Sequence, residues 1–154
     1  MPRGATFAGL LAALAIALAG CGGTSNRPTP QFAAIANAIC VNADREVEAL
    51  PAVRRSLGSL AAAARREIPI VRTELTQLSA LAAPPGQAAR FAAALATTRR
   101  QVSLVAGLVA AVRSANGSRV VTLALASHEA DKRAKTEMRA LGLGACARAA
   151  KPRG

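Results

Sequence analysis

The feature that most constrains the fold is a seam of mostly apolar positions between residues 88 and 112. Steps of three and four alternate along it without a miss, through Ala88, Phe91, Leu95, Thr98, Val102, Val105, Val109 and Val112. This spacing keeps the side chains on one face of an α-helix, and it is typical of helices that pack at small angles in bundles. We therefore expect one long helix here, closed by the Asn116-Gly117 turn.

Three further segments have a helical period. We expect helices from about residue 31 to 50, from 53 to 82 with a kink at Pro69, and from 119 to 141. Thr29 and Ser118 are the expected N-caps, and Gly142 is the expected residue after the last helix. The expected inward positions are Ala36, Cys40, Ala43, Val47 and Leu50; then Leu57, Leu60, Ala64, Ile68, Val71, Leu75 and Leu78; then Val120, Leu123, Ser127, Ala130, Ala134, Met138 and Leu141.

The composition points to the same class of fold. Hydrophobic residues make up 52% of the chain but aromatic residues only 2%, so Ala, Leu and Val dominate the apolar content. Ala and Leu favour helices, whereas strands favour β-branched and aromatic residues. Short connections place neighbouring helices antiparallel, so we expect an all-α, up-down four-helix bundle. Two ladders of charge, Glu129–Arg133–Glu137 and Asp131–Lys135–Arg139, are expected on the outside of the last helix.

The start of the chain has the pattern of an export signal. A positive Arg3 precedes an apolar run, Phe7 to Ala19, that is too short to span a bilayer. Leu18-Ala19-Gly20-Cys21 resembles the bacterial lipobox, in which lipid is added to the cysteine and the chain is cut before it. The resemblance implies a diacylglyceryl group on Cys21. An ordinary signal peptide with an incidental cysteine is the alternative.

These patterns divide the chain into four parts. Residues 1–20 are the expected signal peptide, 21–30 the anchor cysteine and a flexible tether, 31–148 the bundle, and 149–154 a basic tail. The expected location is the outer face of the bacterial cytoplasmic membrane, where membrane lipid is a partner through acylated Cys21.

Two cysteines remain if lipid occupies the first. In an oxidising compartment an even number favours one disulfide, here Cys40–Cys146, although two unpaired buried thiols are an alternative. To bring the sulfurs together, the tail from Gly142 to Ala145 must fold back along the first helix.

The mature chain resembles a group of small helical lipoproteins of high-GC bacteria. The resemblance covers most of residues 31–148 and rests on Ala36 to Cys40, an Arg-rich second helix with an internal proline, a Pro-Pro break, and Gly142 to Cys146. It implies the helical fold and the Cys40–Cys146 bridge. It implies no activity.

The formal net charge of +12 favours anionic partners. Five arginines return to nearly the same side of the second helix and form a candidate anion-binding stripe: Arg54, Arg55, Arg65, Arg66 and Arg72. An anionic lipid or a wall polymer would fit it, whereas a solvated flank covering the core edge is the alternative. Nucleic acid is not expected as a partner, because three Phe are the only aromatic residues available for stacking.

Little in the sequence indicates catalysis. His128 is the only histidine, and Lys132 stands where a zinc-protease helix needs a second one. We expect no enzyme, cofactor or metal, and interpret the chain as a binding or structural module of the cell envelope with an unknown protein partner. The alternative is a small-ligand binder, with a cavity at the Pro69 kink or among the many Ala and Val side chains, and a buried, mostly apolar cavity of about 300 Å³ or more would favour it. An enzyme would need two convergent ionisable side chains in one cleft.

Overall fold

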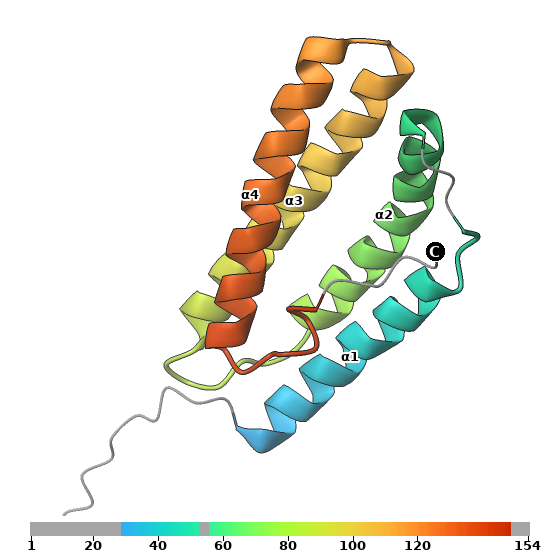
Figure 1. Ribbon diagram of the computed structural model, residues 1–154. Helices are drawn as coiled ribbons and strands as arrows, with labels where there is room; N and C mark the ends of the chain where they lie inside the picture. Colours follow the sequence, from blue (N-terminus) through green and yellow to red (C-terminus); the bar gives the residue numbers. More distant parts are fainter. Residues whose placement is uncertain (1–28, 53–55, 149–154) are drawn as a thin grey trace, which may run out of the picture.

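The computed structural model describes residues 29–52 and 56–148, and four antiparallel helices occupy most of them (Figure 1). They are α1 (Pro30–Glu48), α2 (Leu57–Ser79), α3 (Ala88–Arg113) and α4 (Gly117–Ala140). Each helix packs on the next one in the sequence. This confirms the all-α bundle and its up-down order, as the short connections require.

Side-chain caps fix where three of the helices start. Thr29 Oγ1 accepts a hydrogen bond from the Phe32 amide, as expected from the Thr-Pro start of α1. Ser56 caps α2, so this helix starts at Leu57 and not at about residue 53 as expected. Asn116 rather than Ser118 caps α4, because its side-chain oxygen accepts from the Arg119 amide at 3.1 Å. The expectation that Ser118 would be the N-cap was wrong, because the cap lies two residues earlier.

Helix α2 runs through Pro69 as one continuous helix, as the uninterrupted apolar stripe predicted. Proline has no N–H to donate to the preceding turn. Its own carbonyl oxygen accepts a hydrogen bond from Thr73 Oγ1 at 3.1 Å, in addition to its place in the helix. The helix ends at Ser79, three residues earlier than expected.

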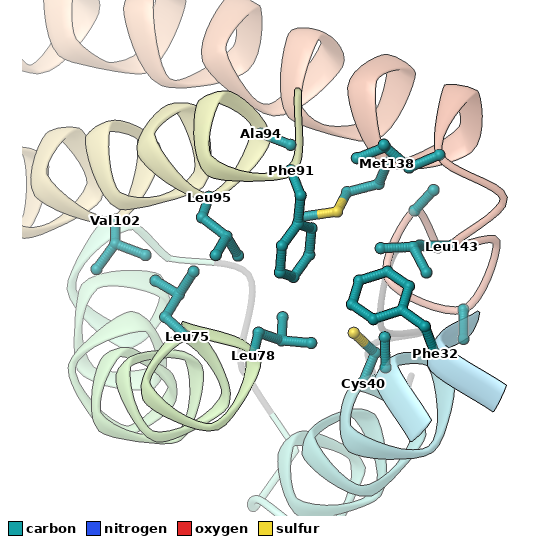
Figure 2. Close-up of a cluster of buried hydrophobic side chains, with 14 residues drawn as sticks. Phe32, Cys40, Leu75, Leu78, Phe91, Ala94, Leu95, Val102, Met138 and Leu143 are labelled. Carbon is teal, nitrogen blue, oxygen red and sulfur yellow. The ribbon is translucent and has the colours of Figure 1, made fainter. Parts of the chain in front are cut away.

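The core lies at the end of the bundle where α2 leads into α3 (Figure 2). Its two phenylalanines meet edge to face, with the Phe32 and Phe91 ring centroids 5.1 Å apart. Aliphatic and sulfur-containing side chains from every helix and from the C-terminal tail complete it: Ala36, Cys40, Leu75, Leu78, Ala94, Leu95, Val102, Met138, Leu141, Leu143, Ala145 and Ala147. The core therefore ties the chain's first helix to its last described residues.

The expected inward positions are buried only where another element covers them. At the start of α2, Leu57 is 64% exposed and Leu60 is 53% exposed, so their assignment to the interior was wrong. The periodicity identifies a face of a helix, but burial also requires a neighbour at that level. Further along the same stripe, Leu75 and Leu78 are buried by the core.

The C-terminal tail returns to α1 through a turn at Gly142. This glycine has a φ of 72°, a left-handed conformation that L side chains disfavour. Its amide donates to the Arg139 carbonyl, and the amide of buried Leu143 donates to the Met138 carbonyl, which is the Schellman pattern. The Cα atoms of α1 and α4 do not come within 8 Å of each other, so the tail connects these two helices.

Several expectations lie outside the described residues. The signal peptide, Cys21 and most of the tether fall in residues 1–28, and the basic tail is residues 149–154. Within the described ranges, every helix is too short or too polar to cross a membrane.

Candidate functional site: a carboxylate-lined cavity

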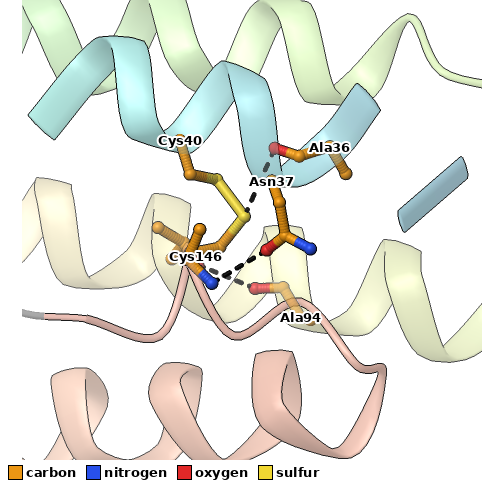
Figure 3. Close-up of a disulfide and its surroundings, with 7 residues drawn as sticks. Ala36, Asn37, Cys40, Ala94 and Cys146 are labelled. Carbon is orange, nitrogen blue, oxygen red and sulfur yellow. Dashed lines mark hydrogen bonds between the residues drawn. A yellow bond between two sulfur atoms is a disulfide. The ribbon is translucent and has the colours of Figure 1, made fainter. Parts of the chain in front are cut away.

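The Cys40–Cys146 disulfide joins the middle of α1 to the returning tail (Figure 3). The bridge closes a sequence separation of 106 residues, and it confirms the expected pairing. Beside it, the Ala145 amide donates a hydrogen bond to Asn37 Oδ1 at 2.8 Å. The Cys146 Sγ also lies 3.6 Å from the Ala36 carbonyl oxygen. Because this sulfur belongs to the disulfide and has no S–H, the contact is not a hydrogen bond. The tail is thus held at several points against α1.

A cavity of about 240 Å³ lies directly against this disulfide. Side chains from all four helices and from the tail line it: Cys40, Ala43, Asp44, Val47, Glu67, Val71, Glu74, Thr98, Gln101, Asp131, Ala134, Lys135, Ala145, Cys146 and Arg148. Two of these, Glu67 and Val71, flank Pro69, where a cavity was expected. Its polar lining differs from the apolar one expected there, and it is smaller than about 300 Å³.

Four carboxylates converge on the cavity. Asp44 comes from α1, Glu67 and Glu74 come from α2, and Asp131 comes from α4. Seven residues separate the two glutamates, which is close to two helical turns and so places them on one face of α2. The chain has only 8 acidic residues against 20 basic ones, so half of its acidic residues line one cavity.

Burial raises the pKa of three of these carboxyl groups, namely Asp44, Glu67 and Glu74. Desolvation, with a smaller contribution from the Asp44 charge, raises the pKa of Glu74 from 4.5 to about 7. Burial also raises the pKa of Glu67. The pKa of Asp44 is raised by burial and by Glu48, although the Arg148 charge acts in the opposite direction. The cavity therefore disfavours the negative charge that its own side chains carry.

Only part of that charge is neutralised within the cavity. Lys135 Nζ lies 2.6 Å from Asp131 Oδ2, and Arg148 acts on Asp44. Neither Glu67 nor Glu74 has an ion-pair partner among the described residues. With every group ionised, four carboxylates and two cations leave a balance of two negative charges.

The Asp131–Lys135 pair was expected on the outer face of α4, and this was wrong. Both side chains are half-buried and line the cavity, because the buried Ala134 lies between them in the same inward stripe. In the other ladder Arg133 is exposed as expected, but Glu137, whose Oε1 accepts from Arg133 Nε at 2.8 Å, is half-buried. Its first member, Glu129, pairs with Lys132 instead of Arg133.

The same region contains a possible ligand set for a metal ion. Ligand atoms of Cys40, Glu74 and Cys146 lie within 4.8 Å of one another. Because the two sulfurs form a disulfide, they offer no thiolate to a metal. In this oxidised form, the carboxylates carry the ligand chemistry of the cavity.

The structure separates the members of the expected arginine stripe. Arg65, Arg66 and Arg72 are exposed on α2, whereas Arg54 and Arg55 lie outside the described residues. Of the three, Arg72 lines a groove between α2 and α3, and Arg99 of α3 lines the same groove. His128 is exposed on α4 and takes no part in the cavity.

The carboxylates of the cavity were not identified from the sequence as site residues. A signal was present, because Glu67 and Glu74 each precede a residue of the apolar stripe, namely Ile68 and Leu75. Asp44 similarly follows the buried Ala43. Acidic side chains at the edge of an apolar face are notable in so basic a chain, but the pattern does not show that they converge.

Comparisons with protein-family models, with curated proteins and with solved structures find no match for this chain. The fold and the cavity therefore carry the functional argument.

Proposed function

We propose that this protein is an exported, lipid-anchored binding module that holds a small cationic ligand in its carboxylate-lined cavity. The observation that carries the proposal is the convergence of four carboxylates, two of them without an ion-pair partner in the described chain, on one cavity between helices. Bundles commonly build ligand sites in this way, from inward side chains of facing helices.

The electrostatics of the cavity favour a positively charged ligand. An ionised carboxylate that burial has stripped of water costs free energy unless a positive charge compensates it. Because burial raises the pKa of Glu74 to about 7, this side chain avoids the cost by keeping its proton up to about that pH. A bound cation would replace that proton, so binding should be tighter above this pH and should release protons near it.

The cavity also limits the ligand's size and charge. Its volume of about 240 Å³ is that of roughly eight water molecules, below the usual range for drug-sized ligands. The balance of two negative charges suits a dication best. Thr98 and Gln101 add neutral hydrogen-bonding groups to the lining. A short alkyl diamine has the required size and charge.

We also propose that the chain is anchored by lipid at the outer face of the cytoplasmic membrane. The lipobox-like Leu18 to Cys21 supports lipid attachment at Cys21, and the Cys40–Cys146 disulfide is what an oxidising compartment favours. Mass spectrometry of the mature protein should find a lipid-modified N-terminal Cys21. An unmodified N-terminus elsewhere would refute the anchor but leave the cavity intact.

Calorimetric titration with a short alkyl diamine at about pH 8 tests the binding proposal. We expect one site per chain, weakened at least tenfold by Glu74→Gln, since a charged hydrogen bond contributes roughly 1.5–3 kcal/mol. Glu46→Gln is the matched control, because it removes the same charge from an exposed position on α1. Equal affinities for the wild type and both variants would overturn the site.

A second candidate function is acid–base catalysis. Convergent carboxyl groups in one cleft were the feature that an enzyme would need, and a pKa of about 7 suits Glu74 to proton transfer near neutral pH. Binding is the better-supported function, because a nucleophilic serine, cysteine thiol or histidine is absent from the cavity lining among the described residues. Chemical change of the titrated probe would favour the enzyme instead.

A further inference from the structure

A groove of about 500 Å³ runs between α2 and α3. Two arginines, Arg72 and Arg99, line it together with the hydroxyl-bearing Thr76, Ser79 and Ser103. Its lining contains no carboxylate, and neither arginine forms an ion pair with an acidic residue in the described chain. In contrast to the acidic cavity, this groove thus presents uncompensated positive charge.

The hydrogen bonds in the groove occupy its hydroxyl donors but only one donor nitrogen of the Arg99 guanidinium. Arg99 Nη2 donates to Ser79 Oγ, which orders its side chain. The hydroxyls of Ser79, Thr76 and Ser103 donate to backbone carbonyls of their own helices. A guanidinium has five N–H donors in a planar fork, so two of them across a groove suit the oxygens of a phosphoryl group.

The groove lies toward the end of the bundle at which the N-terminal segment joins it. The start of α1 and the connection from α2 to α3 are at this end (Figure 1), and the Phe32 and Phe91 rings meet there. Arg72 stands seven residues before the end of α2, about 10 Å along the helix axis. The chain from Cys21 to Thr29 can reach at most about 30 Å. A membrane that holds Cys21 is therefore within reach of the groove.

We propose that Arg72 and Arg99 bind the phosphoryl group of an anionic phospholipid in the membrane that anchors the chain. The proposal goes beyond cation binding in the cavity, and it rests on lipid attachment at Cys21. It is also narrower than a diffuse basic stripe, because it assigns binding to two arginines on different helices. Bound in this way, the bundle would lie with its α2–α3 face toward the bilayer.

Vesicle binding of the mature chain with Cys21→Ser, which removes the anchor, tests the assignment. We expect binding to vesicles with anionic phospholipid, weakened at least twentyfold in the Arg72→Gln, Arg99→Gln double variant, since each such residue contributes about fivefold near an anionic surface. The control double variant, Arg65→Gln with Arg66→Gln, removes the same charge outside the groove and should lose no more than about threefold. Equal losses in the two double variants would overturn the site.

Two further arms identify the source of the phosphoryl group. Vesicles of zwitterionic lipid should bind at least tenfold more weakly than anionic ones, because their headgroups compensate the phosphate charge. Inorganic phosphate should shift the NMR signals of the Arg72 and Arg99 side chains and leave Arg66 unchanged. Phosphate binding without any vesicle binding would refute the membrane assignment. Glu74→Gln should leave vesicle binding unchanged, so failure here is distinguishable from failure of the cavity.

Discussion

Replacing Glu74 by glutamine should make the protein more stable and less able to bind its ligand. Glutamine is similar in shape to a protonated glutamate but cannot ionise, so it removes a charge that the cavity disfavours. The pKa of Glu74 is raised from 4.5 to about 7. Because the folded chain holds this proton more tightly than the unfolded chain, ionisation of Glu74 works against folding.

The size of the effect follows from the same shift. Each pKa unit corresponds to about 1.4 kcal/mol, so ionised Glu74 lowers the free energy of unfolding by up to about 3 kcal/mol. The loss begins as pH rises above 4.5, the ordinary value, and is complete above about pH 7. At about pH 4 the variant and the wild type should therefore be equally stable. At about pH 8 the variant should melt roughly 10 °C higher.

Thermal unfolding of the disulfide-bonded chain across this pH range measures the difference. Glu46→Gln, at an exposed position on α1, changes the net charge equally and should alter the melting temperature little at any pH. The reasoning would be refuted if Glu74→Gln had the same effect at about pH 4 as at about pH 8, or if it destabilised the protein throughout. If Glu74→Gln both stabilises the protein and weakens cation binding, Glu74 is retained for ligand binding at the expense of stability.

Three further predictions concern the framework that holds the cavity. Replacing Cys40 and Cys146 by serine should lower the free energy of unfolding by about 4 kcal/mol, because the disulfide closes a long loop. Chemical denaturation measures this loss, and a loss of less than about 1 kcal/mol would contradict the prediction. Gly142→Ala should cost roughly 1–2 kcal/mol because of its φ of 72°, whereas Gly144→Ala, with nothing within 4 Å of the added Cβ, should be nearly neutral; equal costs would argue against the turn. Phe91→Ala should cost about 3–5 kcal/mol in the same assay, and a loss under 1 kcal/mol would show that the core is loosely packed.

The helices could be predicted because local signals set them. The period of α3, the Thr29 cap and the glycine after α4 all appear in the sequence, and the helix, the cap and the turn are present in the structure. Of the seam positions of α3, Phe91, Leu95, Val102 and Val109 are buried, whereas Ala88 is exposed. The failures also have local causes. Asn116 caps α4 two residues before the expected Ser118, and Leu57 has the right spacing but is 64% exposed among the described residues.

The cavity could not be predicted because it depends on the relation between helices. A helical period shows that Glu67 and Glu74 share a face, but not that Asp44 and Asp131 approach the same point. That convergence is fixed by the tail, whose turn at Gly142 and disulfide to α1 set the spacing between α1 and α4. Pairing of the cysteines was predictable from their number, whereas the space they leave beside them was not.

Native mass spectrometry of the protein isolated from its own membrane tests the central claim most directly. The account predicts one bound small organic cation per chain, released on acidification through about pH 7 and absent from the Glu67→Gln, Glu74→Gln double variant. A chain that carries no cation at about pH 8, or a double variant that retains the bound cation, would contradict it.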